Sequence, residues 1–375
     1  MTDPNPRISI VYDKFLVRGG GERVCDILIE AFPQARIYAL NAYPREYWEN
    51  RLGRKVETPI FGFLFMNKIL VGVFYPLALL LMSSLRIKAD IVIVYSSTVG
   101  KFVRLDCKKR YLYSNYPNRL LYQPWKMITN KVILLILNPF IKIMALLDKS
   151  QFKRYHYIYS ISESSRKALL DFAKVDSNVL FPPFDERGIT SQKVDDDPRI
   201  RDYFLVVSRL EPEKEIEYVI TTFSRLGHKL RVVGDGSLFS KLSQKEFHNI
   251  KYLGYIDDKA LAAEYAGAKA LIFPSDIEYS LVPLEAAFLG TPTIGLRTQA
   301  TEDILTEEVN SDSSSGNAVL YDSKSPESLS EAICRFENIT WDRNAIRKSC
   351  ENFSRQAFIK QIQSIVLGKT TRPNV

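Results

Sequence analysis

The hydrophobic residues of the first half of the chain fall into short runs of the kind found in buried β-strands. These runs are rich in Ile, Val and Tyr and stand at residues 8–12, 36–40, 90–95, 110–114 and 157–162. Apolar residues with helical spacing lie between some of them, at 22–32 and 163–173. Because strands that alternate with helices form parallel sheets covered on both faces, this half predicts an α/β domain.

The pattern stops near residue 183 and restarts at residue 203. The interval 184–202 is rich in proline and charge and lacks periodicity, which is typical of a linker. Strand patterns then stand at 203–208, 229–234, 250–254, 269–275 and 291–295, and helical patterns near 214–226, 257–267, 283–289, 326–336 and 343–366. We therefore predict two Rossmann-like domains, 1–183 and 203–350, and a final helix within 351–375 that returns to the first domain.

Charge is distributed unevenly along the 375 residues. Residues 51–154 contain 18 Lys and Arg against four Asp and Glu, a local net charge of +14. Since the whole chain carries +8, the remainder carries −6. This asymmetry predicts a polyanionic partner for the first half alone.

The start of the chain and the spacing of its cysteines indicate the cellular compartment. The first residues, MTDPNPR, lack the pattern of a signal peptide, and the four cysteines have neither metal-ligand nor disulfide-like spacing. We expect reduced thiols in the cytoplasm.

Two apolar runs lie within the basic segment, at 69–85 and 131–147. The first has 17 uncharged residues but contains Pro76, and the second is interrupted by Pro139 and Lys142. About 20 apolar residues are needed to span a bilayer, so neither run predicts a transmembrane helix. They are either core helices of the first domain or an apolar surface rimmed by Lys and Arg that contacts anionic lipid. The local charge favours the membrane surface, and no nucleic-acid-binding module is recognisable.

Candidate chemistry gathers where strands of the second half end. Arg209 and Lys214 follow the strand 203–208, a place that suits a diphosphate in an open α/β crevice. Gly234 and Gly254 end the next two strands, and glycine lets the backbone approach a ligand closely. A helix opens near Pro283, so Glu285 lies in its first turn and could accept both hydroxyls of a ribose.

Together these stretches resemble the retaining glycosyltransferases of family 4, which have the GT-B fold of two Rossmann-like domains with parallel sheets facing across a cleft. The resemblance covers most of the chain and rests on GGGERV (19–24), VSRLEPEK (207–214), VVGDGS (232–237), IKYLGYI (250–256) and FPSDIEYSLVPLEAAFLGTP (273–292).

The resemblance implies roles for particular residues. Arg209 and Lys214 match the basic pair that holds the donor diphosphate in place of a metal, so neither metal nor cofactor is implied, and Glu285 matches the ribose ligand. The implied donor-binding residues are Gly20, Gly21, Gly234, Asp235, Gly254, Tyr255, Ser280, Leu281, Val282 and Glu285. The implied acceptor-side residues are Asp13, Asn115 and Arg119.

The sequence departs from the family pattern in the loop before Glu285. The family's first glutamate falls at Ile277 here, its glycine falls at Ser280, and Asn115 stands where many relatives have a histidine. Either the loop shifts by one residue, so that Glu278 or Asp276 contacts the donor sugar, or this carboxylate is missing. We favour the first explanation and assign Glu278 to the catalytic set with Arg209 and Lys214.

The expected function is retaining transfer of a sugar from a nucleoside-diphosphate sugar to a lipid-linked saccharide acceptor at the inner face of the membrane. A nucleotide-sugar epimerase of the same fold and a non-catalytic sugar-nucleotide-binding subunit are the alternatives. An NAD-dependent oxidoreductase does not fit, because GGGERV lacks the G-x-G-x-x-G spacing.

Overall fold

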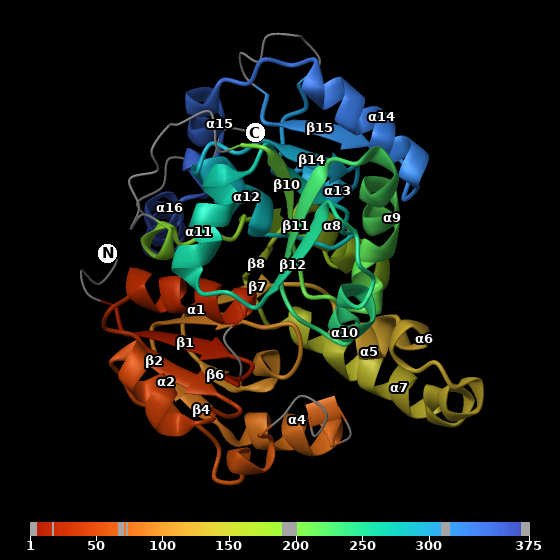
Figure 1. Ribbon diagram of the computed structural model, residues 1–375. Coiled ribbons are helices and arrows are strands. Elements are labelled where there is room, and N and C mark those ends of the chain that lie inside the picture. The colour runs from red at the N-terminus through yellow and green to blue at the C-terminus, as the bar shows by residue number, and fades with distance from the viewer. Residues whose placement is uncertain are drawn as a thin grey trace. The chain divides into compact units, whose positions relative to one another are not determined.

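The computed structural model describes residues 6–16, 19–66, 71–72, 74–189, 201–308 and 316–368. The chain forms two compact units, one of Met1–Pro182 with Phe358–Val375 and one of Pro183–Ala357. Each contains a parallel sheet with helices packed on it (Figure 1). The predicted α/β class, with two Rossmann-like domains, is confirmed.

The sheet of the first unit has the strand order β3-β2-β1-β5-β7-β8-β9, and every neighbouring pair is parallel. Its strands are β1 (Ile8–Tyr12), β2 (Arg36–Ala39), β3 (Val56–Glu57), β5 (Ile91–Tyr95), β7 (Lys109–Ser114), β8 (Tyr157–Ser160) and β9 (Asn178–Val179). The central strands β1 and β5 are buried at every position, which explains their continuous runs of apolar residues. A separate parallel pair is formed by β4 (Arg86–Lys88) and β6 (Arg104–Asp106).

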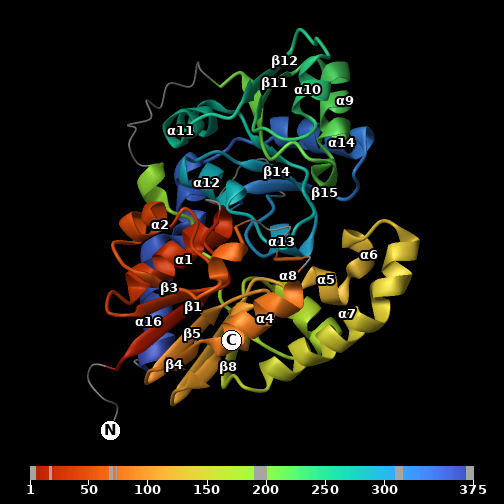
Figure 2. The same ribbon diagram turned by 90° about the horizontal axis from the view of Figure 1, so that it is seen from below.

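Helices cover both faces of this sheet (Figure 2). Side chains of α1 (Gly20–Ala31), α2 (Arg45–Leu52) and α16 (Arg355–Leu367) join the core on one face. Those of α4 (Tyr75–Ser84) and α7 (Lys131–Phe152) join the core on the other. The shorter elements are η1 (Gly62–Leu64), η2 (Gly100–Phe102), α5 (Arg119–Tyr122), α6 (Pro124–Met127), α8 (Glu163–Ala168) and the π-helical turn η3 (Leu169–Ala173).

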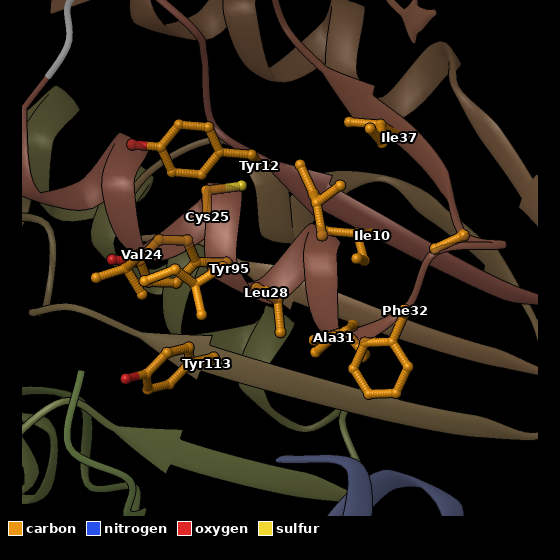
Figure 3. Close-up of a cluster of buried hydrophobic side chains, with 14 of the residues drawn as sticks. Ile10, Tyr12, Val24, Cys25, Leu28, Ala31, Phe32, Ile37, Tyr95 and Tyr113 are labelled. Carbon is orange, nitrogen blue, oxygen red and sulfur yellow. The ribbon is translucent and has the colours of Figure 1, made fainter. Parts of the chain in front are cut away.

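A row of tyrosines crosses the first sheet where its strands end. Tyr12, Tyr95 and Tyr113 are register partners on β1, β5 and β7. Their rings stack with centroids 5.4 and 5.1 Å apart, beside Cys25 and Leu28 of α1 (Figure 3). Large flat rings fill this layer of the core and hold the first turn of α1 against the sheet.

The apolar run that the sequence interrupts at Pro139 is part of one 22-residue helix, α7. Asn130 caps it by accepting hydrogen bonds from the amides of Val132 and Ile133. Pro139 is exposed, so water can reach the carbonyl that loses its helical partner there. Within the described part of the chain, no helix combines the length and the apolar character that crossing a membrane requires.

The second unit contains a six-stranded parallel sheet of order β12-β11-β10-β13-β14-β15. Its strands are β10 (Tyr203–Val207), β11 (Lys229–Val233), β12 (Ile250–Gly254), β13 (Leu271–Phe273), β14 (Thr293–Leu296) and β15 (Ala318–Tyr321). Its α-helices are α9 (Ile216–Leu226), α10 (Phe239–Ser243), α11 (Asp258–Gly267), α12 (Val282–Phe288), α13 (Gln299–Glu302), α14 (Pro326–Glu337) and α15 (Arg343–Ser349). Short turns are η4 (Glu186–Gly188), η6 (Pro212–Lys214) and η7 (Glu351–Phe353).

The segments between the two units differ in part from the sequence pattern. Residues 184–189, at the start of the predicted linker, pack in the second unit, where buried Phe184 forms a bridge with Ser354. Residues 190–200 of that linker lie outside the described residues. The helical pattern over 343–366 is divided between α15 and α16. In the first unit, α16 buries Phe358, and Gln363 donates to the carbonyl of Ala31 at 2.7 Å.

Candidate functional site

The loops that follow β10, β11 and β12 are hydrogen-bonded to one another at the carboxyl edge of the second sheet. The amide of Ser208 donates to the carbonyl of Val233 at 3.1 Å, and that of Leu210 to Asp235 at 2.9 Å. Gly234 lies between them with φ +124°, and a Cβ there would lie 1.9 Å from the carbonyl oxygen of Ser208. Only glycine fits this approach, so the loops have little freedom to separate.

Arg209 and Lys214 lie on the loop after β10. The Arg209 side chain is 71% exposed and lies 3.8 Å from the carboxylate of Glu213. Lys214 ends the short turn η6, where its amide donates to the carbonyl of Glu211 at 2.9 Å. The loop is therefore an ordered support that carries two cations at the sheet edge.

Glu211 attaches this loop to the next one. Its carboxylate accepts hydrogen bonds from the hydroxyl and the amide of Ser237, and these bonds lower the pKa of Glu211. Asp235 accepts from the amide of Gly236 at 2.7 Å, as a turn residue does. Gly254 ends β12 with φ +66°, and Tyr255 after it is exposed.

Glu285 lies in the first turn of α12 and is buried. The hydroxyl of Tyr265, on α11, donates to its Oε2 at 3.0 Å. The carbonyl of Tyr265 accepts from the hydroxyl of Thr291 at 2.6 Å, so the tyrosine is itself held in place. This buried contact orients the carboxylate close to the helix amides.

The loop before α12 explains the departure at Ile277. Ile277 packs against the core of the second unit, while Asp276 next to it is exposed and Glu278 is partly exposed. The hydroxyl of Ser280 accepts from the amide of Val282 at 3.3 Å, beside Leu281 at the N-cap position. An isoleucine at 277 thus has a packing role, and the carboxylates of this loop lie on either side of it.

The predicted acceptor-side residue Asp13 supports a loop in the first unit. It is buried directly after β1 and accepts hydrogen bonds from the hydroxyl of Ser96 and the amides of Ser97, Thr98 and Gly100, at 2.6 to 3.1 Å. Four donors to one carboxylate fix the loop that follows β5.

The other predicted residues of the first unit lie at the same sheet edge or near it. A Cβ on Gly21 would lie 3.0 Å from the Tyr12 hydroxyl and 3.9 Å from Nδ2 of Asn115, so α1 approaches the strand ends closely where Gly20 opens it. The Oδ1 atom of Asn115 is buried, and none of the described residues forms a hydrogen bond with it. Arg119 is exposed at the start of α5, over the ring of Tyr116.

Several residues that build these edges were missed by sequence reasoning. Tyr265, Glu211 and Ser237 support the donor-side candidates, and Ser96 and Gly100 bind Asp13. Their partners are 20 to 87 residues away in the chain. No local pattern marks such contacts, although the paired glycines 234 and 236 do indicate the turn that Glu211 binds.

A family profile described as Glycosyl transferases group 1 matches residues 191–358, which include every candidate of the second unit. Among curated proteins, an uncharacterized glycosyltransferase of Methanocaldococcus jannaschii is 29% identical over 127 residues, 31% of this chain and 32% of its own length. Glycogen synthase of Thermus thermophilus is 28% identical over 157 residues, 40% of this chain and 34% of its own. The match therefore spans about a third of these relatives.

Solved structures match nearly the whole chain. HepE of Anabaena, in complex with UDP, aligns with a TM-score of 0.66 and 15% identity, covering 97% of this chain and 100% of HepE. The lipopolysaccharide outer core galactosyltransferase WaaB, in its apo form, aligns with a TM-score of 0.64 and 15% identity over the same shares. At this identity the likeness concerns the fold, and the predicted GT-B fold is confirmed. The chain thus has the GT-B fold, and its second unit carries a region similar to the glycosyl transferases of group 1.

Proposed function

We propose that this protein is a retaining glycosyltransferase that moves a sugar from a nucleoside-diphosphate sugar to a saccharide acceptor. One observation carries the proposal. In the region similar to group 1 glycosyl transferases, Arg209 and Lys214 lie on a loop that approaches Gly234 too closely for any other residue there. The same unit carries the buried Glu285, whose carboxylate accepts a hydrogen bond from Tyr265. Arg209 and Lys214 would bind the diphosphate, and Glu285 would bind the ribose hydroxyls.

The cations would contribute most as the bond to the diphosphate breaks. Negative charge then grows on the leaving group, and preorganised positive charge stabilises it without further rearrangement. In retaining transfer on one face, the anomeric carbon–phosphate oxygen bond breaks while the acceptor oxygen bonds to that carbon. The acceptor proton passes to the leaving phosphate. Arg209 and Lys214 would thus do the work that a divalent cation does elsewhere, and Glu278 would contact the donor sugar.

We further propose that the acceptor is lipid-linked and that the protein works at the cytoplasmic face of a membrane. The support is the net charge of +14 within residues 51–154, beside an acidic remainder. Nucleic acid is not the proposed polyanion, since the second unit has no excess of positive charge and the first carries large exposed apolar side chains.

The test begins with donor binding. Purified full-length protein is screened against nucleoside diphosphates and their sugars by thermal shift, because a ligand bound only by the native state raises the melting temperature. Transfer is then measured with lipid-linked saccharides extracted from membranes, and the anomeric configuration of the product is read by NMR. Retention is expected.

Variants separate the cations from general charge effects. Lys214→Met and Arg209→Met are each expected to lower turnover by about 10²- to 10³-fold. Lys229→Met, at the amino end of β11, and Arg225→Met, at the end of α9, are the matched controls and should leave turnover unchanged. Full turnover in Lys214→Met would overturn the assignment. Epimerised sugar formed from donor alone would favour the nucleotide-sugar epimerase. Donor binding without transfer to any acceptor would favour the non-catalytic subunit.

A further inference from the structure

Large apolar side chains are exposed in an unusual concentration on the first unit. Most of the exposed apolar residues in the described part of the chain lie between Ile60 and Leu147, on η1, α4, α6 and α7. On α7 they are Val132, Ile133, Leu135, Ile136, Leu137, Phe140, Ile143, Leu146 and Leu147. Nine exposed apolar side chains on one helix are more than scattered surface residues, and a concentration of this kind marks a docking site.

One side of the C-terminal half of α7 is buried against the protein. Ile141, Asp148 and Phe152 are buried there, seven and four residues apart, which places them on one side of a helix with 3.6 residues per turn. The carboxylate of Asp148 pairs with Lys101, with 2.9 Å between Nζ and Oδ1, and accepts from the hydroxyl of Tyr122 at 3.1 Å. These contacts fix which side of α7 faces outward.

The charges of α7 lie along one edge of its outward apolar surface. Lys131, Lys142, Lys149 and Lys153 are separated by eleven, seven and four residues, so they share one flank of the helix. Asp148 is the only acidic residue between Asp106 and Glu163, and it is buried in its ion pair. A row of cations beside an apolar stripe, without exposed acid, complements an anionic lipid surface.

We propose that α7 is a membrane-docking helix that lies in the plane of an anionic bilayer, with its outer apolar side chains among the acyl chains and its lysines at the headgroups. The helix is about 33 Å long at 1.5 Å per residue. Its exposed apolar side chains run from Val132 to Leu147, so all of them reach the acyl chains only if the helix lies flat. The neighbouring helix α6, which contacts α7, also exposes Trp125 and Met127.

The exposed apolar side of α7 could instead bind another protein. Protein interfaces carry a polar rim in which charges of both signs find partners. The exposed charges of α7 have one sign only, which fits phosphate headgroups better than a polypeptide. This inference rests on the membrane association proposed for the function. It is tested without measuring sugar transfer, so the docking helix and the transferase activity can each fail while the other holds.

The test is cosedimentation of the full-length protein with vesicles of phosphatidylcholine and with vesicles containing 30% phosphatidylglycerol. Binding is expected to the anionic vesicles and to weaken with added salt. Leu135→Gln/Leu146→Gln should weaken binding at least about tenfold, since both side chains would leave the acyl region. Lys149→Gln/Lys153→Gln should weaken binding about tenfold to anionic vesicles alone.

The matched control is Leu226→Gln, which makes the same chemical change at an exposed leucine of α9 in the second unit, with 38% exposure against 74% and 69% for Leu135 and Leu146. This variant should bind as the parent does, and all variants should keep the parent's circular dichroism and melting temperature. Equal loss in the control, or parental binding by Leu135→Gln/Leu146→Gln, would overturn the proposal. A dimer in sedimentation that Leu135→Gln/Leu146→Gln dissociates, without vesicle binding, would also overturn it.

Discussion

Lys101 and Asp148 form a buried ion pair that connects α7 to the loop around Asp13. The side chains are 1% and 0% exposed, and their charged atoms lie 2.9 Å apart. The Lys101 ammonium also donates to the carbonyl of Ser97 at 3.3 Å, and the Ser97 amide donates to Asp13. One polar network thus joins the proposed docking helix to a predicted acceptor-side residue.

Breaking this pair on one side should be costly. Lys101→Met leaves a buried carboxylate without its cation, and we expect a loss of about 3–5 kcal/mol in the free energy of unfolding. Lys101→Met/Asp148→Asn removes the buried charge and keeps an acceptor for Tyr122, so it should be more stable than Lys101→Met alone. Denaturant unfolding of the three proteins measures the difference. A double variant no more stable than Lys101→Met would contradict the role of charge.

The same pair predicts a pH dependence. Burial raises the pKa of Asp148, an effect that Lys101 opposes. Removing Lys101 leaves the pKa further above its unfolded value of about 3.9, so the folded protein holds a proton that the unfolded chain releases. Stability of Lys101→Met should therefore be greatest below pH ~4 and fall as the pH rises toward the raised pKa. Unfolding measured from pH 4 to 8 checks this, and Lys101→Met/Asp148→Asn should lack the slope.

Glycine at 234 is predicted to be required by the donor-side loops. Gly234→Ala would set a Cβ against the Ser208 carbonyl at φ +124°, so we expect a loss of at least about 2 kcal/mol and weaker binding of nucleoside diphosphates. Gly227→Ala is the control, since that residue also has positive φ, at +73°, but the described part of the chain places no atom within 4 Å of the added Cβ. Equal losses in the two variants would show that the close approach is unimportant.

The sequence predicted the long central strands and the amphipathic helices because their burial imposes a visible pattern. The two-residue edge strands β3 and β9 were missed, since so few residues show no period, and the four-residue β15 was missed although β2 and β14 are equally short. The sequence did not show that Pro139 lies inside one continuous helix, which tolerates it because the residue is on the exposed side of α7. Short strands and tolerated prolines depend on neighbours that the sequence does not show.

The candidate site was predictable to a different degree in the two halves. Motifs placed Arg209, Lys214 and Glu285 near strand ends, and their assignment to donor binding stays a prediction. The support around them could not be read from the sequence. Asp13 meets its donors across more than 80 residues, and Ile277 could not be recognised as a packing residue before the core beside it was known.

The four cysteines should differ sharply in reactivity. Burial raises the pKa of Cys25 and raises that of Cys350 to about 12, so little thiolate forms in either at neutral pH. Cys107 is partly buried with a raised pKa, whereas Cys334 is exposed. Titration of the native protein with a thiol reagent should show one fast group, which Cys334→Ser removes. Fast labelling of Cys25 would show that the first unit opens readily.

Tyr265 should act on donor binding through Glu285. Tyr265→Phe removes the hydroxyl that orients the carboxylate, and we expect donor affinity to fall about tenfold, as loss of a hydrogen bond to a charged group costs about 1.5–3 kcal/mol. Tyr203→Phe is the matched control, because its hydroxyl donates to the carbonyl of Glu264 at 2.9 Å from the opposite sheet edge. Calorimetric titration with a nucleoside diphosphate compares the two. Because Tyr265 works by positioning, Glu285→Gln should weaken binding at least as much, and adding Tyr265→Phe to it should weaken binding little further. Independent, additive losses would mean that the tyrosine supports the fold rather than the carboxylate.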